Sequence, residues 1–373
     1  AVAAIEACRG RGGAAALRCA ARRWPWAGGQ RRRLYVCGGA TLQRAWGCME
    51  CFDPRSGSWS QLPEMSQTRY LASTVVLAGR IYILGGASRK PDGQDTVPLR
   101  TVECFDLAEG VWDTLPPMAH PRFAATAGAL GGLLYVCGGH STRALNAGER
   151  FDPQARRWEA MPPMYQPRFL AMSAVIDRRL YVCGGCSHRA CGALSSCERF
   201  CEPLDDWEGL PPMSQKRFDA AYAVMGTCLY ICGGYDGVVP LNSAERFDVA
   251  SGRWEALPLM VQRRSGAVAT VVAPAGAADA PRLFVCGGHS GFGAVNSTEC
   301  FSASAGTWER WAPMLECRSE PTAAVIDGRV YVCGGHDGRE TLSTTEVLDP
   351  LTGIWQTQPR MNVARTGSVT TVV

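Results

Sequence analysis

Seven copies of one pattern occupy most of this chain. Each copy has a short apolar run that ends in two adjacent glycines, then a glutamate before a mostly aromatic position, a single tryptophan, and a methionine followed four residues later by an arginine. The first glycines of successive pairs are 47, 53, 46, 49, 54 and 47 residues apart. A period of this length is typical of propeller blades with four strands each. The glycines are Gly38, Gly39, Gly85, Gly86, Gly138, Gly139, Gly184, Gly185, Gly233, Gly234, Gly287, Gly288, Gly334 and Gly335, and the tryptophans are Trp59, Trp112, Trp158, Trp207, Trp254, Trp308 and Trp355.

Each copy supplies four strand signals, which predicts an all-β fold. A first strand follows the arginine, as in residues 168–176, and a tight turn such as Asp327-Gly328 leads into a continuous apolar run, as in residues 330–333. The third strand holds the glutamate, and the fourth begins at the tryptophan. We expect the first strand to be innermost, because a small or compact residue recurs three positions after each arginine: Ala72, Ala125, Ala171, Ala220, Ala267, Pro321 and Ser368.

The two ends of the chain each hold part of a blade. Residues 34–37 are a second-strand signal with no first strand before them, and residues 365–373 are a first strand with nothing after them. Together these pieces make one blade. We therefore predict seven blades in residues 34–373, with the C-terminal strand completing the first blade so that no open sheet edge remains.

The glycine pairs, the tyrosine before many of them, the spaced tryptophan and the Pro-Met-x-x-x-Arg element resemble the kelch-repeat family, in particular the propeller of the Kelch-like (BTB-kelch) proteins. The resemblance covers about residues 34–373. It departs from Kelch-like proteins in blade number, because those usually have six, whereas galactose-oxidase-type kelch proteins have seven. It also includes no BTB or BACK region, so substrate recognition for a ubiquitin ligase is implied only if such domains, or an F-box, precede residue 1.

Residues 1–33 differ from the rest in composition and charge. They hold eight arginines and one glutamate, a net charge of +7, so residues 34–373 carry 30 basic and 33 acidic side chains, a net charge of −3. A slightly acidic body favours no nucleic-acid partner, and no apolar run is long enough to span a membrane. We expect this Ala/Gly/Arg-rich head to be disordered or the remnant of an upstream region, with a transit peptide as the alternative.

Cysteine placement argues against disulfides. Equivalent positions in different blades are too far apart to bridge, and six cysteines stand at one such position, directly before a glycine pair: Cys37, Cys137, Cys183, Cys232, Cys286 and Cys333. We expect buried, reduced thiols, which favours a cytoplasmic location.

The fourth blade is richer in cysteine, with five cysteines and His188 between Cys183 and Cys201. A metal site, a redox-active loop and ordinary thiols are the three interpretations, and ordinary thiols are favoured because Cys183 holds a position that is cysteine in five other blades. In the loop after the glycine pair, Cys186 and Cys191 are expected to react first.

Enzymes on propeller folds are the alternative to a binding module. A sialidase-type site needs arginines that converge on a carboxylate, and a galactose-oxidase-type site needs copper held by histidines and a crosslinked tyrosine. The sequence offers no distinctive tyrosine or cysteine partner for its histidines, so we expect no catalytic residue, no metal and no cofactor; a sugar-epimerase-like enzyme is the third variant. The recurring charged residues are instead expected to form one structural ion pair per blade: Arg69, Arg122, Arg168, Arg217, Arg264, Arg318 and Arg365 with Glu50, Glu103, Glu149, Glu198, Glu245, Glu299 and Glu346.

Strand direction selects one face of the ring for function. Because neighbouring strands of a blade are antiparallel, the loops before the first strands and after the second strands lie on the same face. In Kelch-like proteins this face binds partner peptides through the residues just after the arginine and just after the glycine pair. The resemblance, together with the nearby charges, therefore assigns partner contacts to Tyr70, Phe123, Phe169, Phe218, Asp219, His140, Arg143, Tyr235, His289 and His336.

The aromatic residues of this set have two interpretations. In one, Phe123, Phe169 and Phe218 project into the mouth of the ring and anchor a peptide or loop of a protein partner. In the other, they fold down between blades as packing. The function expected in the first case is a non-enzymatic interaction module.

Overall fold

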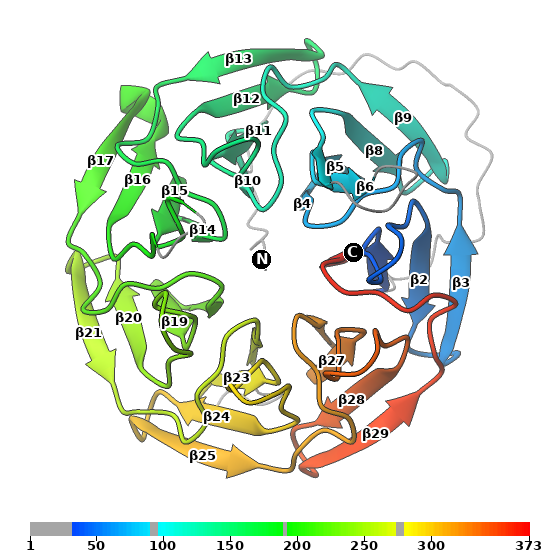
Figure 1. The fold of residues 1–373 in the computed structure, drawn as a ribbon, viewed down its shortest axis with the longest axis vertical. Helices are drawn as coiled ribbons and strands as arrows, with labels where there is room; N and C mark the ends of the chain where they lie inside the picture. The colour runs from blue at the N-terminus through cyan, green and yellow to red at the C-terminus, as the bar shows by residue number, and fades with distance from the viewer. Residues whose placement is uncertain (1–31, 90–95, 189–191, 274–279) are drawn as a thin grey trace, which may run out of the picture.

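The computed structural model describes residues 32–89, 96–188, 192–273 and 280–373. Seven four-stranded antiparallel sheets, numbered here as blades 1 to 7 from the N-terminus, are arranged in a ring (Figure 1). The centre of such a ring is the central channel of a propeller. Within the described residues the one helical element is the short 3-10 turn η1 (Glu202–Leu204). The predicted all-β propeller with seven blades is confirmed.

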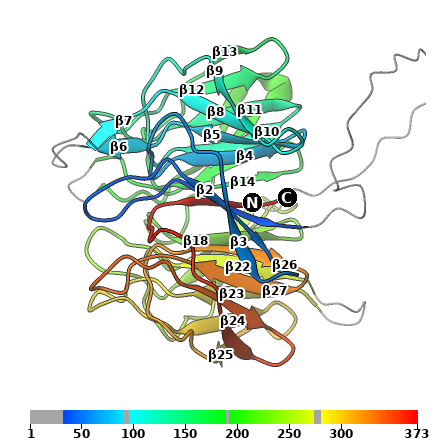
Figure 2. The same ribbon diagram turned by 90° about the vertical axis from the view of Figure 1, so that its right-hand side faces the viewer.

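In blades 2 to 7 the strands run from the channel outward in chain order, whereas in blade 1 the C-terminal strand is innermost. Blade 2 carries an additional hairpin that projects from one face of the disc (Figure 2). Blade 1 contains β30 (Val369–Val372), β1 (Leu34–Cys37), β2 (Met49–Asp53) and β3 (Ser58–Leu62); blade 2 contains β4 (Ser73–Leu77), β5 (Arg80–Leu84), β8 (Val102–Asp106) and β9 (Val111–Leu115), with the hairpin β6 (Ala87–Arg89) and β7 (Thr96–Pro98); blade 3 contains β10 (Thr126–Leu130), β11 (Leu133–Cys137), β12 (Gly148–Asp152) and β13 (Arg157–Met161).

The other four blades need no additional strands. Blade 4 contains β14 (Met172–Ile176), β15 (Arg179–Cys183), β16 (Cys197–Cys201) and β17 (Asp206–Leu210); blade 5 contains β18 (Ala221–Met225), β19 (Cys228–Cys232), β20 (Ala244–Asp248) and β21 (Arg253–Leu257); blade 6 contains β22 (Val268–Val272), β23 (Arg282–Cys286), β24 (Thr298–Ser302) and β25 (Thr307–Trp311); blade 7 contains β26 (Thr322–Ile326), β27 (Arg329–Cys333), β28 (Thr345–Asp349) and β29 (Ile354–Gln358).

The second strand of each blade is the most deeply buried. In β15, residues 180–183 have no exposed surface, because adjacent blades cover both faces of the sheet. A strand with one wet face would alternate apolar and polar residues, so the continuous apolar run follows from this burial. In the hairpin before β27, Asp327 and Gly328 have φ angles of 49° and 77°. Two left-handed residues are what a two-residue turn between antiparallel strands requires.

The glycine pair at the end of each second strand has a steric cause. All of these glycines have positive φ. A Cβ on Gly86 would lie 2.9 Å from the Ala72 Cβ, and a Cβ on Gly85 would lie 2.4 Å from the Arg122 carbonyl oxygen. No side chain fits at these distances. The pair is therefore the point where the innermost strand of one blade and the arginine segment of the next blade approach the same backbone.

The tryptophan of each fourth strand ties its blade to the preceding one. In blade 4, the Trp207 indole N–H donates to the Pro162 carbonyl oxygen at 2.9 Å, and its ring packs on Phe200 with ring centroids 5.5 Å apart. In blade 1, the Trp59 indole N–H reaches back to the Pro359 carbonyl oxygen at 2.9 Å. The tryptophan therefore lies on the flank between neighbouring blades.

The C-terminal strand closes the ring. β30 pairs antiparallel with β1, with Leu34 opposite Val372 and Cys37 opposite Val369. Blade 1 is thus assembled from both ends of the propeller, as predicted, and the chain leaves no unpaired inner edge at the seam.

Candidate functional site at the channel mouth

The arginine before each first strand forms a buried ion pair with the glutamate of the third strand in its blade. In blade 2, Arg69 Nη2 lies 2.6 Å from Glu103 Oε1, and Arg69 Nη1 donates to the Gly85 carbonyl oxygen at 2.8 Å. The other carboxylate oxygen of Glu103 accepts the Ser66 backbone N–H at 2.7 Å. The same pairing recurs as Arg122–Glu149, Arg168–Glu198, Arg217–Glu245, Arg264–Glu299, Arg318–Glu346 and Arg365–Glu50.

These pairs are structural. Each guanidinium and carboxylate of the seven pairs is at most 4% exposed. Burial lowers the pKa of Arg69 and of Arg217, and the facing glutamates oppose that change. Removing one partner would leave an unpaired buried charge, at a cost of about 3–5 kcal/mol. The arginines therefore do not converge on one free carboxylate, and the structural interpretation of the repeat is confirmed.

The residue after each arginine and the residue after each glycine pair are bridge partners. The Phe123 N–H donates to the His140 carbonyl oxygen at 3.0 Å, and the His140 N–H donates to the Phe123 carbonyl oxygen at 2.9 Å. The two sets of loops therefore share one face, as predicted; we call this face the mouth. In blade order the bridged pairs are Thr366–Ala40, Tyr70–Ala87, Phe123–His140, Phe169–Cys186, Phe218–Tyr235, Ser265–His289 and Ser319–His336.

The aromatic part of the mouth is packed more tightly than expected of exposed anchors. His140 lies between Phe123 and Phe169, at ring-centroid distances of 5.2 and 4.9 Å. Phe123 is 8% exposed and Phe169 is 9% exposed, so neither projects into the mouth, and that interpretation is wrong for both. Phe218 and Tyr235 are half-buried, with ring centroids 5.6 Å apart.

The other predicted contact residues are more accessible. Tyr70 is half-buried; its hydroxyl lies 2.9 Å from the Thr96 hydroxyl, and the Arg89 guanidinium stands over its ring at 5.6 Å. His289 is exposed, and its Nδ1 accepts the Gly291 N–H at 3.0 Å. His336 repeats this turn in blade 7, where its Nδ1 accepts the Gly338 N–H at 2.9 Å.

A hydrogen-bonded ring encircles the channel just inside the mouth. The residue two positions after each arginine has a φ between 50° and 59°. At six of the seven positions its backbone N–H donates to the equivalent carbonyl of the preceding blade, as from Ala124 to Leu71 at 2.8 Å. The sequence analysis did not predict this ring. The sequence feature that points to it is the glycine at two of the seven positions, because glycine favours a positive φ. The ring consists of Gly367, Leu71, Ala124, Leu170, Asp219, Gly266 and Glu320.

The ring is chemically uneven. Leu71, Ala124 and Leu170 make one side apolar, whereas Asp219 and Glu320 flank Gly266 on the other. A Cβ on Gly266 would lie 3.2 Å from Asp219 Oδ2 and 3.3 Å from Glu320 Cγ, so both acidic side chains lie beside this glycine. Burial, together with the charge of Glu320, raises the pKa of Asp219 to about 7, although the Gly266 N–H opposes this.

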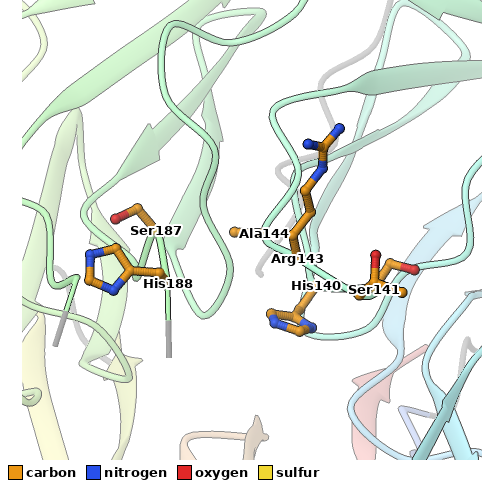
Figure 3. A pocket seen from close by; sticks show the side chains of 7 residues that line it. His140, Ser141, Arg143, Ala144, Ser187 and His188 are labelled. Carbon is orange, nitrogen blue, oxygen red and sulfur yellow. The ribbon is translucent and has the colours of Figure 1, made fainter. Parts of the chain in front are cut away.

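A cavity of about 390 Å³ opens between blades 3 and 4 on the mouth. One wall is the loop from β11 to β12, which carries His140 and the exposed Arg143; the other is the start of the loop from β15 to β16, which carries Ser187 and His188 (Figure 3). Ala144, Ser141 and Thr142 complete the lining. The structure thus places Arg143 and His140, both predicted contact residues, in one cavity.

The cysteine-rich blade holds no metal cluster within the described residues. Cys183 and Cys197 are opposite each other on β15 and β16, and both are buried. Cys186 is only 3% exposed, and its thiol donates to the His188 carbonyl oxygen at 2.9 Å, so the expectation that it reacts first is wrong. Cys191 lies outside the described residues. In residues 32–89, 96–188, 192–273 and 280–373 no three His, Cys, Asp or Glu side chains are grouped so as to hold a metal ion.

The thiols before the glycine pairs lie where the repeat predicts. All six are buried, and the described cysteines are free thiols. Burial raises the pKa of Cys37, Cys137, Cys232 and Cys286 to about 12. Such groups stay protonated and react slowly.

Comparisons with known proteins agree with this geometry. The model of the KLHDC2/KLHL20/DRC7 Kelch-repeats domain matches residues 21–185, and the Kelch motif matches residues 167–214, 216–260 and 317–362. The chain belongs to the kelch-repeat family. The motif matches cover blades 4, 5 and 7 with the same glycine, tryptophan and arginine positions that build the ion pairs and the mouth.

Curated relatives of this kelch-repeat protein include larger kelch proteins. Kelch repeat and BTB domain-containing protein 12 of Danio rerio is 34% identical over 28% of this chain and 20% of its own length. Human Kelch-like protein 33 is 34% identical over 28% and 19%, and Kelch-like ECH-associated protein 1B of Danio rerio is 32% identical over 28% and 17%. This chain therefore matches about a fifth of the length of these relatives, and only in the kelch region.

Among solved structures, the one titled "Structure of YjhT" has the same fold as this kelch-repeat protein. The TM-score is 0.60 at 14% sequence identity, over 80% of this chain and 99% of the other. At this identity the similarity concerns the fold alone. The described residues include no helix long and apolar enough to cross a bilayer.

Proposed function

We propose that this propeller is a non-enzymatic interaction module that binds an extended segment or loop of a partner protein across the mouth. The contact set is the one expected from the sequence, with the accessible members Tyr70, Phe218, Tyr235, His289 and His336 in direct contact. Phe123 and Phe169 would act from beneath, because they hold His140 in place.

One observation carries the proposal: the mouth has seven equivalent backbone sites that carry six different pairs of side chains. The bridges repeat in every blade, yet the paired side chains change from aromatic in blades 2 to 5 to hydroxyl and imidazole in blades 6 and 7. The arginine–glutamate pairs directly beneath do not vary. A surface that varies on an invariant frame is suited to recognise one partner, because complementary chemistry is what gives an interface its specificity.

The relatives support the same class of function. Two of them are named as Kelch-like proteins, and the name of one of these describes it as ECH-associated. Substrate recognition for a ubiquitin ligase follows only if BTB, BACK or F-box domains are joined to this propeller. The buried free thiols support a cytoplasmic location. A galactose-oxidase-like or sugar-epimerase-like enzyme is the alternative. The described residues offer such an enzyme neither grouped metal ligands nor repeat arginines that converge on a free carboxylate.

The test compares two faces of the same protein. Phe218→Ala combined with Tyr235→Ala should abolish capture of partner proteins from a cell extract while the melting temperature falls only slightly. A matched pair on the opposite face, Arg55→Ala with Leu351→Ala, should capture the same partners as the unchanged protein, since both residues lie in exposed turns there. Equal loss from both pairs, with folding intact, would show that the wrong face has been chosen.

A further inference from the structure

Four sulfur-bearing side chains come together in the interior of blade 4. Met172 on β14 lies directly opposite Cys183 on β15, and Cys183 lies directly opposite Cys197 on β16. Side chains that are opposite each other in antiparallel strands share one face of the sheet, with Cβ atoms about 4.5–5.5 Å apart. The three sulfur-bearing side chains therefore form a row across three strands.

Met213 adds a fourth sulfur to this row. It lies in the segment that leads from blade 4 to blade 5, and its N–H donates to the Ser195 carbonyl oxygen at 2.9 Å. A Cβ on Gly184 would lie 2.8 Å from Met172 Cε and 2.9 Å from Met213 Cε, so both thioether groups reach the residue next to Cys183. All four sulfur-bearing side chains belong to one hydrophobic cluster, and none is more than 3% exposed.

The complete row of sulfurs is particular to blade 4. In each of the other six blades at least one of the three positions, all of which lie in the described residues, holds a residue without sulfur. From the innermost strand outward these positions are Val369, Cys37 and Met49 in blade 1; Ser73, Leu84 and Val102 in blade 2; Thr126, Cys137 and Gly148 in blade 3; Ala221, Cys232 and Ala244 in blade 5; Val268, Cys286 and Thr298 in blade 6; and Thr322, Cys333 and Thr345 in blade 7. Blade 4 alone among them places two thiols opposite each other.

The two thiols interact with each other and with a buried cation. Burial, and after it the contact with Cys197, raises the pKa of Cys183 well above its ordinary value. The Arg168 guanidinium opposes that rise, and the Glu198 carboxylate adds to it. A metal cation that binds between the thiols would displace their protons. A monovalent cation and two thiolates together carry a single negative charge, which the positive charge of Arg168 favours.

The ligand set favours one class of metal ion. Zinc is bound by Cys, His, Asp and Glu, and in the described chain no third side chain of these types is grouped with the two thiols. Thiolate and thioether sulfur together select Cu(I), a soft ion, over harder cations. The available ligands therefore match Cu(I) better than Zn²⁺.

We infer that these four side chains form a buried site for one Cu(I) ion, with two thiolates and two thioethers as ligands: Cys183, Cys197, Met172 and Met213. Binding would release two thiol protons to solvent and change no oxidation state. The ion would tie β14, β15 and β16 to the segment that leads into blade 5. Such a site is separate from the contact set of the mouth and so goes beyond the proposed function. It is not expected from the sequence alone, because the methionines meet the thiols only in the folded blade.

Competition with a chelator tests the site. The probe is Cu(I) alone, supplied without oxygen to the intact chain as its bicinchoninate complex and left to equilibrate, so that local opening of the blade admits the ion. One equivalent of Cu(I) should move from the chelator to the protein. Cys183→Ser with Cys197→Ser should lower the affinity at least about 100-fold, and Met172→Leu with Met213→Leu should lower it about tenfold.

Methyl NMR locates the bound ion, because the chain has 18 cysteines and 11 methionines. Loading with Cu(I) should shift the methyl signals of Met172 and Met213. The signals of Met260 and Met314, which hold the position of Met213 in blades 5 and 6, should stay in place. This pattern separates the site in blade 4 from binding to thiols elsewhere in the chain.

Blades 5 and 6 also supply the matched control variants. Cys232→Ser with Cys286→Ser, and Met260→Leu with Met314→Leu, should bind Cu(I) like the unchanged protein, because neither cysteine has a second thiol opposite it. The inference is overturned if no Cu(I) leaves the chelator, or if the two double cysteine variants lose affinity equally. Equal shifts of the Met213, Met260 and Met314 signals would also overturn it. If a blade 4 variant does not fold, the methyl shifts of the unchanged protein decide the question.

Discussion

Single residues in this propeller follow two rules, one for positions that repeat and one for positions that vary. The repeated arginine, glutamate and glycines are fixed by contacts that tolerate no other side chain, such as the 2.4 Å that would separate a Gly85 Cβ from the Arg122 carbonyl oxygen. The varied positions lie one residue away on the same backbone. The bridge of Phe123 and His140 is made by main-chain hydrogen bonds alone, so the side chains at such positions can differ from blade to blade. Neighbouring residues can therefore have separate roles, fold and recognition.

Phe123 and Phe218 occupy equivalent positions but should respond differently to truncation. Phe123→Ala removes a buried ring that packs on His140 and should lower the free energy of unfolding by about 3–5 kcal/mol. Phe218→Ala removes a half-buried ring and should cost about 1 kcal/mol. Chemical denaturation of the two variants measures both values. Equal losses would mean that the difference in burial between the two rings does not affect the free energy of unfolding.

Asp219 should make stability depend on pH. Its pKa is raised from an ordinary value of 3.8 to about 7, so the folded protein binds more protons than the unfolded chain between these values. The contribution is favourable at low pH and is lost as the pH rises through 7. Asp219→Asn should therefore stabilise the folded protein at pH 8 by about 1–3 kcal/mol and so raise its melting temperature. At pH 4 the same substitution should change the melting temperature little.

Asp337 is the control of opposite sign. The N–H groups of Glu340 and Arg339 lower the pKa of its carboxyl, so its contribution is present above the unfolded value and is lost as the pH falls. Asp337→Asn should lower the melting temperature at pH 8. A parallel response of the two variants across pH 4 to 8 would contradict the assigned environment of Asp219.

Thiol reactivity should follow burial rather than position in the repeat. Cys228 and Cys317 are the partly exposed cysteines among the described residues and should be alkylated before Cys137 and Cys232, whose pKa values burial raises to about 12. Mass spectrometry after brief alkylation of the folded protein gives the order. Early modification of the strand cysteines would mean that the blades open far more readily than this packing allows.

At the scale of strands and loops, a repeated sequence pattern predicts the structural features that recur in every blade. The blades, the closure by β30 and the arginine–glutamate pairs could all be predicted, because each depends on spacing and residue type within one copy. The burial of Phe123 and Cys186 could not, because it depends on how loops from different blades meet. The ring of left-handed residues was hidden for a similar reason: Leu71 and Leu170 give no local sign of a positive φ.

The seam of the ring is the element whose removal should matter most. Deleting residues 369–373 removes β30 and exposes the edge of β1, while Arg365 and its ion pair with Glu50 remain. The loss should be several kcal/mol in stability. Deleting residues 365–373 should cost more, because it also leaves Glu50 buried without its partner.

Thermal unfolding of both truncated chains checks this order. A melting point within a degree or two of the full chain for either truncation would contradict closure by the C-terminal strand.

The junction between blades 7 and 1 is also where the ring of backbone hydrogen bonds is weakest. Among the described residues, the Gly367 N–H makes no bond to the Glu320 carbonyl oxygen; the Thr366 hydroxyl lies 3.4 Å from that oxygen instead.

At the scale of the whole molecule, one face of the disc carries side chains that differ from blade to blade. Its turns on the far side, such as residues 53–57, are short and regular, whereas the mouth gathers the aromatic and imidazole pairs, the acidic ring residues and the cavity of blades 3 and 4. The kelch relatives share the frame over about a fifth of their length.

Site-specific photo-crosslinking tests the central proposal most directly. A benzophenone amino acid replaces Tyr235 at the mouth in one protein and Leu351 on the far side in another; both proteins are illuminated in a cell extract and their adducts compared by mass spectrometry. The account predicts discrete partner adducts from position 235 that are absent from position 351. Equal adducts from both positions, or adducts from position 351 alone, would contradict it.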